Sequence, residues 1–161
     1  MRARRIFLIG ASFLFALYAA LLILNLTGYA YPVEGVSMQP ILRYGYMAFV
    51  EPATISQLVP NSTIIVYYNP FYRELVIHMV INKIDDYAVI VKGVNPITNP
   101  YPDLNYSSET PLLVTQNMIR GRVVFWVPYL GFLILRPYNF VISLIFVVAV
   151  LVNALNNKGA S

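Results

Sequence analysis

The sequence predicts a mostly β protein in which an antiparallel β domain is flanked by an N-terminal and a C-terminal transmembrane helix. Two long apolar stretches near the ends of the chain, with short β-rich segments between them, support this prediction. Composition supports it as well. Of the 161 residues, 58% are hydrophobic and only 11% are charged, whereas about 25% of the residues of soluble domains are charged.

The first apolar stretch predicts a transmembrane helix over residues 6–30. No charged residue lies between Ile6 and Val33, and about 20 apolar residues are enough to cross a bilayer. The alternative is a cleaved signal peptide that ends at residues 28–30. The apolar run is longer than the roughly 7–15 residues of a signal-peptide core, so an uncleaved anchor is favoured.

The second apolar stretch, residues 138–156, has no charged residue. Its length is marginal but sufficient for a spanning helix with little tilt. The alternative is a buried or interfacial helix, which the scarcity of polar residues disfavours. The positive-inside rule puts the N-terminus in the cytoplasm, because arginines precede the first helix and no positive charge follows it until Arg43. The expected organisation of this multi-pass cell-membrane protein is a cytoplasmic N-terminus (1–5), a transmembrane helix (6–30), an extracytoplasmic β-rich domain (31–135), a second transmembrane helix (138–156) and a cytoplasmic tail (157–161).

Five segments of the middle region have the β-branched and aromatic composition of strands, and turn-forming residues separate them. Two of these segments, joined by Asp85 and Asp86, predict a β-hairpin. Residues 94–111 are rich in proline and asparagine and predict a long loop without regular structure, which is usually functional or disordered. The predicted strands are 46–50, 63–68, 74–84, 87–93 and 122–127.

Composition excludes several kinds of site. The chain has no cysteine, so disulfides and thiolate chemistry are excluded. His78 is its only histidine, which argues against a zinc site because zinc in proteins usually takes three or four nitrogen, sulfur or oxygen ligands. The net charge of +4 is scattered, without the basic stripe of a nucleic-acid-binding protein. We expect no metal, no other cofactor and no nucleic-acid partner.

Three residues of the middle region could form a nucleophilic site. Ser37 lies in a turn that contains glycine and proline, His78 in the strand LVIHMVI, and Asp103 in the long loop. Each residue alone has an ordinary structural explanation. Together they supply what a serine nucleophile needs, because a histidine can act as its base and a carboxylate can orient the histidine. Lys83 and Lys92 remain alternative bases.

Four segments resemble, in order, the sequence boxes of type I signal peptidases of the archaeal and endoplasmic-reticulum branch. The run Ser37–Met38–Gln39–Pro40 resembles the S-M-x-P box of the nucleophile. LVIHMVI resembles the I-H-R-V box, in which histidine replaces the lysine base of the bacterial enzymes. VKGVNPITNPYPD resembles the third box, and GRVVFWVPYLGFL resembles the segment that closes the catalytic domain. The four boxes cover most of the middle region.

The resemblance implies a membrane-bound serine endopeptidase that removes signal peptides from exported preproteins at the outer face of the membrane. Ser37 would be the acylating nucleophile, His78 the general base, and Asp103 the acid that orients His78. The domain would have the family's mostly antiparallel β fold. The partners would be preprotein signal peptides and the lipid bilayer, and association with the secretion machinery would fit this role.

The resemblance also implies which residues near the nucleophile bind the substrate. Met38 would line a pocket that in this family accepts small residues at positions −1 and −3. Gly35 and Val36 would lie at the oxyanion hole, formed by the backbone N–H of Ser37 and a neighbouring donor. Gly35 replaces a serine that often contributes its hydroxyl to that hole.

At other positions the chain departs from the family pattern. Val94 replaces the family's first aspartate, and Met79 replaces the arginine after the histidine. The loop that leads to Asp103 is longer than usual, so Asp85 and Asp86 are fallback partners of His78. These departures favour an alternative, a non-catalytic or degenerate membrane subunit that binds signal peptides. A two-span membrane protein with a β domain for adhesion or assembly is a third interpretation, but it leaves the order of the boxes unexplained.

Overall fold

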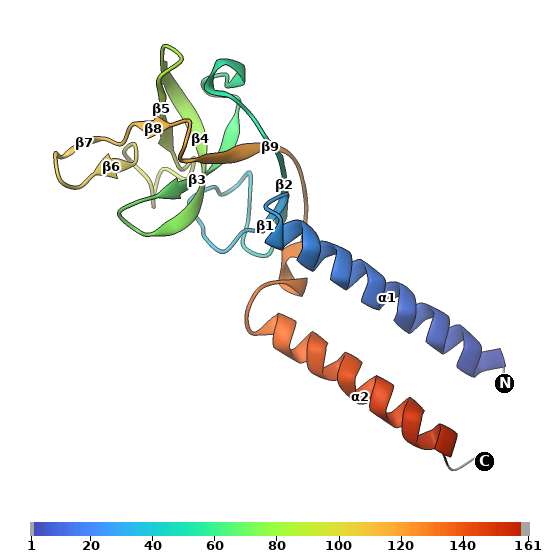
Figure 1. Cartoon of the computed structure of the whole chain (residues 1–161). Helices are drawn as coiled ribbons and strands as arrows, with labels where there is room; N and C mark the ends of the chain where they lie inside the picture. The colour runs from blue at the N-terminus through green and yellow to red at the C-terminus, as the bar shows by residue number, and fades with distance from the viewer. Residues whose placement is uncertain (1, 159–161) are drawn as a thin grey trace.

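The structure, a computed structural model, describes residues 2–158. It consists of a β domain and two long helices (Figure 1). The helices α1 (Arg2–Leu26) and α2 (Tyr138–Lys158) extend from the same side of the β domain and lie side by side. The mostly antiparallel β architecture predicted from the sequence, with a helix at each end, is confirmed.

Seven strands form one antiparallel sheet in the order β1-β2-β9-β3-β4-β5-β8. The five strands predicted from the sequence are all present, and the predicted hairpin joins β4 to β5. The sequence did not predict β1 or β8, which are too short to show an alternating pattern. The strands of this sheet are β1 (Ala30–Pro32), β2 (Met47–Glu51), β3 (Ile64–Asn69), β4 (Glu74–Ile84), β5 (Ala88–Lys92), β8 (Val114–Thr115) and β9 (Ile119–Val127).

The region expected to be an irregular loop, residues 94–111, contains part of a second sheet. There β6 (Leu104–Asn105) pairs with β7 (Thr110–Pro111). The prediction of no regular structure is therefore wrong for the second half of this region. Two-residue strands carry no periodic signal in the sequence, and a proline is tolerated at a sheet edge. Two 3₁₀ turns, η1 (Ile55–Gln57) and η2 (Leu130–Leu133), complete the described elements.

The central strands β3 and β4 are covered on both faces, because successive side chains of a strand point to opposite sides of the sheet. On one face Ile65 and Val80 belong to the largest buried apolar cluster. On the other face Ile64 packs with Met38 and Leu42, which follow β1 in the chain. The segment that contains Ser37 is thus held against the sheet by buried apolar neighbours.

The two helices differ in how well they meet the requirements of a membrane span. Within the described residues, α1 has the length and composition to cross a membrane, over Ile9–Leu26. The apolar part of α2, Tyr138–Val152, is shorter than the 18 residues of that span. The structure therefore has the helix expected over 138–156, but this second helix does not by itself support a membrane crossing.

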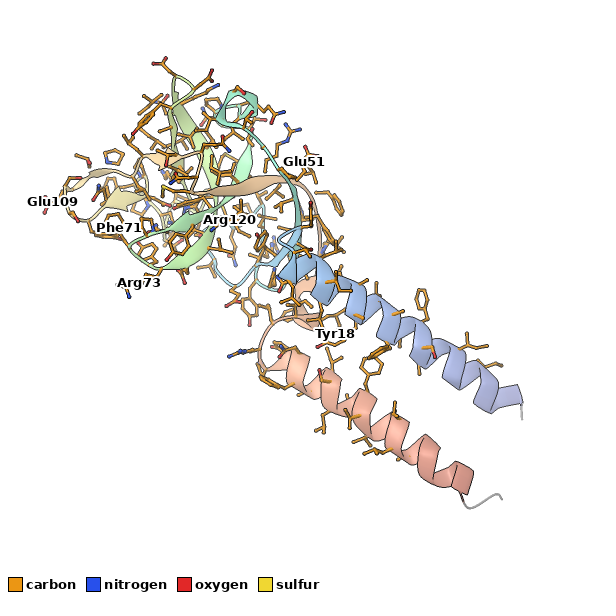
Figure 2. The ribbon with its side chains drawn as sticks, in the orientation of Figure 1. Tyr18, Glu51, Phe71, Arg73, Glu109 and Arg120 are labelled. Atoms are coloured by element: carbon orange, nitrogen blue, oxygen red, sulfur yellow. The ribbon has the colours of Figure 1, made fainter. Side chains whose placement is uncertain are left out.

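Aromatic side chains hold α1 against α2. The hydroxyl oxygens of Tyr18 and Ser143 are 3.1 Å apart, and the Tyr18 ring stacks on Phe146. Phe15 also contacts the ring of Phe146, in an edge-to-face arrangement. Figure 2 shows Tyr18 on the side of α1 that faces α2. These contacts make the two helices an antiparallel pair.

We expect Ile65→Ala to lower the free energy of unfolding by about 2–5 kcal/mol, because it leaves a cavity at a fully buried position. Urea unfolding followed by the fluorescence of Trp126, the only tryptophan, would measure it. Ile97→Ala is the control, since Ile97 is 89% exposed. Equal stability of the Ile65 variant and the wild type would contradict this placement of the core.

Candidate active site

His78 and Asp103 form a buried pair. Nδ1 of His78 lies 2.7 Å from Oδ2 of Asp103, and the two side chains are 6% and 7% exposed. An ionised carboxylate can only accept hydrogen bonds, so Nδ1 carries the hydrogen of this bond. The other ring nitrogen, Nε2, keeps a lone pair that can accept a proton. The structure thus brings together two of the three residues selected from the sequence.

Strand β4 directs His78 into the protein. His78 lies opposite Ile65 of β3, and Val80, two positions further along β4, is fully buried on the same face. The alternation of side chains along the strand therefore turns the imidazole toward the apolar cluster. A hydrogen bond in such surroundings is stronger than one in water, because little solvent screens it.

The backbone of Asp103 is fixed beside β5. Its N–H donates to the carbonyl of Val91 at 3.0 Å, and its own carbonyl accepts from the N–H of Leu112 at 2.7 Å. These two bonds fix the backbone at the end of the loop, because both polar groups of Asp103 are paired. The long loop therefore returns to the sheet at Asp103, beside β5, the strand that pairs with β4.

The fallback acids and one alternative base lie at the far end of β4. Asp85 and Asp86 form the turn to β5, and Asp86 Oδ1 is 2.9 Å from Lys83 Nζ. Lys83 also donates to the carbonyl of Ser56 at 3.3 Å. The structure does not bring this group to the pair formed by His78 and Asp103. Lys92 pairs with Met79, and strand alternation puts it on the opposite face of β5 from Val91.

The turn that carries Ser37 lies against the end of β5. A Cβ atom at Gly93 would be 2.7 Å from the carbonyl oxygen of Ser37, which is closer than a side chain allows. Met79 of β4 pairs with Lys92 of β5. Gly93 directly follows Lys92 and His78 directly precedes Met79, so both residues adjoin this pair. The serine turn is therefore a neighbour of the histidine, although no hydrogen bond joins their side chains within residues 2–158.

Asn95 fastens the serine turn to the loop after β5. Its backbone N–H donates to the carbonyl of Ser37 at 2.8 Å, and its side-chain Nδ2 donates to the carbonyl of Val36 at 3.0 Å. The N–H groups of Ser37 and Met38 donate to no atom of the described part of the chain. They are available to bind a developing oxyanion.

A cavity of about 700 Å³ opens beside the serine turn. Met38, which is 1% exposed, and Gly35 both line it, as does Ser37. Val36 does not line the cavity, so the structure gives its side chain no part in binding there. Burial raises the pKa of Tyr31 above its ordinary value, so this hydroxyl stays neutral near pH 7. Further lining residues are Tyr31, Glu34, Val66, Leu75, Ile77 and Arg136.

Tyr67 and Asn95 belong to the site but were not predicted from the sequence. Tyr67 donates its hydroxyl hydrogen to Oδ2 of Asp103, the oxygen that also accepts from His78. A signal for Tyr67 exists in the segment TIIVYYN, because Tyr67 follows Ile65 by two positions and so shares its face of β3. Asn95 has no such signal, since its partners lie in a distant turn.

Comparisons with known proteins do not assign a family. The chain matches no protein-family model, and no curated protein matches its sequence. Over residues 2–158, no cluster of three or more histidine, cysteine, aspartate or glutamate side chains could hold a metal ion.

We expect Gly93→Ala to destabilise the protein by about 1–3 kcal/mol, the usual cost of overpacking. The added methyl group would meet the Ser37 carbonyl at 2.7 Å and Asn99 Cγ at 2.6 Å. Gly35→Ala is the matched control, because its Cβ would be 3.8 Å from the nearest atom, Ser37 Oγ. Thermal unfolding of both variants would measure the difference. Equal melting temperatures would show that the serine turn is not packed on β5.

Proposed function

We propose that this chain is a membrane-bound serine endopeptidase that removes signal peptides from exported preproteins. The observation that carries the proposal is the buried hydrogen bond between His78 and Asp103, next to the turn of Ser37. It supplies a histidine with a fixed tautomer beside a serine, which is what a serine nucleophile requires. The order of the sequence boxes, similar to that of type I signal peptidases, selects signal peptides as the substrate.

In the proposed mechanism, Oγ of Ser37 attacks the scissile carbonyl while Nε2 of His78 takes the hydroxyl proton. Asp103 stabilises the imidazolium that forms. The N–H groups of Ser37 and Met38 bind the oxyanion of the tetrahedral intermediate. His78 then gives its proton to the leaving amine, and the signal peptide remains as an ester on Ser37. Attack by water, with His78 again as base, releases the signal peptide and restores the serine.

The free edge of β4 is suited to bind an extended peptide beside the serine. Strand β5 pairs with β4 only from Met79 onward, so among residues 2–158 no strand pairs with residues 74–78 on that side. The backbone of Val80 bonds toward β3, and alternation turns the N–H and carbonyl groups of Ile77 and Leu75 the other way, toward the cavity that these residues line. A substrate could add a strand at this edge, as peptides do in β-augmentation.

The proposal includes a membrane location, with the β domain on the outer face. The apolar span of α1 would anchor the chain, and its N-terminal arginines would keep that end in the cytoplasm. We propose α2 as a second span, because it packs antiparallel to α1 and carries exposed apolar side chains. Such side chains are costly in water but not in lipid. Examples are Phe140, Leu144, Ile145, Val148 and Leu151.

A second candidate function is a non-catalytic membrane subunit that binds signal peptides. It is favoured by the lack of a hydrogen bond between the Ser37 hydroxyl and His78 in the described residues, and by Val94 and Met79 in place of family residues. A fluorophosphonate probe separates the two functions. A catalytic serine would be labelled at Ser37, whereas a binding subunit would hold the peptide without being labelled.

We expect the protein purified in detergent to cut a preprotein after a small residue. Ser37→Ala and His78→Ala should each lower kcat by about 10³-fold or more, and Asp103→Asn should approach that loss because it favours the wrong tautomer of His78. Cleavage measured on gels at equal folded concentration would test this. Asp85→Asn is the matched control, since Asp85 is an exposed acid of the hairpin turn. Full activity of His78→Ala would contradict the mechanism. A wild type that binds the signal peptide without cleaving it would favour the second candidate function.

We expect N-methylation of single backbone amides in a substrate peptide to weaken cleavage with a period of two residues. Only alternate amides of an added strand point to the edge of β4. Methylation at an edge-facing amide should raise KM about tenfold, since it removes a hydrogen bond and leaves a polar group unpaired. The neighbouring amides serve as controls in the same assay. A uniform effect along the peptide would exclude pairing with this edge.

A further inference from the structure

Asp103 receives a second hydrogen bond that the mechanism above does not use. The hydroxyl of Tyr67 donates to Oδ2, the same carboxylate oxygen that accepts from Nδ1 of His78. Tyr67 lies on β3 and is fully buried. A buried hydroxyl needs a partner, and here the partner is a carboxylate, for which a hydrogen bond is about twice as strong as one between neutral groups.

Asn69 extends the chain of hydrogen bonds along β3. Its Nδ2 donates to the Tyr67 oxygen at 3.4 Å, and its Oδ1 accepts from the N–H groups of Phe71 and Tyr72 at 2.9 and 3.3 Å. Asn69 is 1% exposed. It thereby ties Tyr67 to the turn between β3 and β4, where Figure 2 labels Phe71. Four side chains from two strands and a loop thus share one buried network.

We propose that Tyr67 is a positioning residue that fixes Asp103 and, through it, the tautomer and basicity of His78. For its part in catalysis this inference rests on the proposed function. The geometric part does not, because it concerns only the state of the imidazole. The hydroxyl can hold the carboxylate in place only as a neutral donor. Burial, followed by the negative charge of Asp103, keeps the pKa of Tyr67 well above its ordinary value, so the hydroxyl stays protonated.

Sharing one oxygen between two donors has a direct effect on His78. The Tyr67 hydrogen bond takes up part of the negative charge of Asp103, so that the carboxylate stabilises an imidazolium less strongly. Without this hydroxyl the imidazolium would be more stable, and the pKa of His78 would rise. At a given pH below that value, a smaller fraction of the histidine would then be the neutral base.

The titratable side chains nearest the network are those of Tyr72, Glu74 and Lys92. The pKa of Tyr72 is raised to about 12, first by its hydrogen bond with Tyr106 and then by burial. Lys92 lies on the opposite face of β5 from the network, whereas Glu74, which is exposed, pairs with Asn69 and lies on the network's face. Tyr67→Phe leaves both side chains in place, so a change in the His78 signals would come from the lost hydroxyl.

The test uses the fact that His78 is the only histidine. Protein labelled with ¹⁵N-histidine in detergent gives one pair of imidazole nitrogen signals, whose shifts report tautomer and pKa without any assay of activity. We expect Tyr67→Phe to mix the tautomers of His78 and to raise its pKa relative to the wild type. Tyr68→Phe is the matched control, because Tyr68 points to the other face of β3 and is 36% exposed. Unchanged tautomer and pKa in Tyr67→Phe would overturn the proposal.

A variant of Asn69 and the cleavage kinetics of Tyr67→Phe test the same role of Tyr67 in other ways. Asn69→Ala should move the pKa of His78 in the same direction but less, since it weakens Tyr67 as a donor, and it serves if Tyr67→Phe does not fold. In the cleavage assay, Tyr67→Phe should lower kcat about tenfold and leave KM within about twofold of the wild-type value. The acid limb of its pH–rate profile should move to higher pH. A fall in kcat together with an equal rise in KM, and no movement of the acid limb of the pH–rate profile, would contradict a positioning role for Tyr67. If the wild type cuts no substrate, the proposed function fails, but the imidazole spectra still show whether Tyr67 fixes the state of His78. Failure of the function and failure of this inference are therefore distinguishable.

Discussion

The hydrogen bond between His78 and Asp103 is the interaction on which the rest of the site depends. A carboxylate that is 7% exposed is costly unless its charge meets donors. Those donors come from β4 and β3, while the backbone of Asp103 is held by β5 and by Leu112. Four separate parts of the chain must therefore be in place before the charge is satisfied. Conversely, any packing that separates those parts would leave the buried charge without donors, and its free energy would be higher.

A second constraint is the close approach of backbone to backbone at Gly93. The glycine is needed for space, since the Ser37 carbonyl occupies the position of a side chain. With that carbonyl turned toward β5 and bonded to Asn95, the N–H groups of the serine turn face away from the loop. One missing side chain thus decides which polar groups the turn presents to the cavity. It also explains how a serine turn distant in sequence comes to lie beside a strand histidine.

The longer strands could be predicted from the sequence, and the short ones could not. Strand β4 and the hairpin to β5 were evident from their β-branched and aromatic residues and from the turn at Asp85 and Asp86. Strands β1, β6 and β7 are only two or three residues long, so they show no periodic pattern in the sequence. The same holds within the site. Asp103 was identified by its residue type and its place in the chain, whereas Tyr67 reads as an ordinary strand aromatic until β3 is placed beside β4.

The connection between α1 and the sheet is short and fully bonded. The N–H of Tyr29 bonds to Leu24, its carbonyl accepts from Val50, and the side chain of Asn25 donates to Ala30. Nothing in this junction resembles a flexible linker, so tilt or rotation of the helix would be passed to the sheet. Under the proposed function and membrane location, a mismatch between the bilayer and the apolar span would change the tilt of the helix and with it the height of the serine above the lipid. The lipid composition of the host membrane would then act on the choice of the scissile bond.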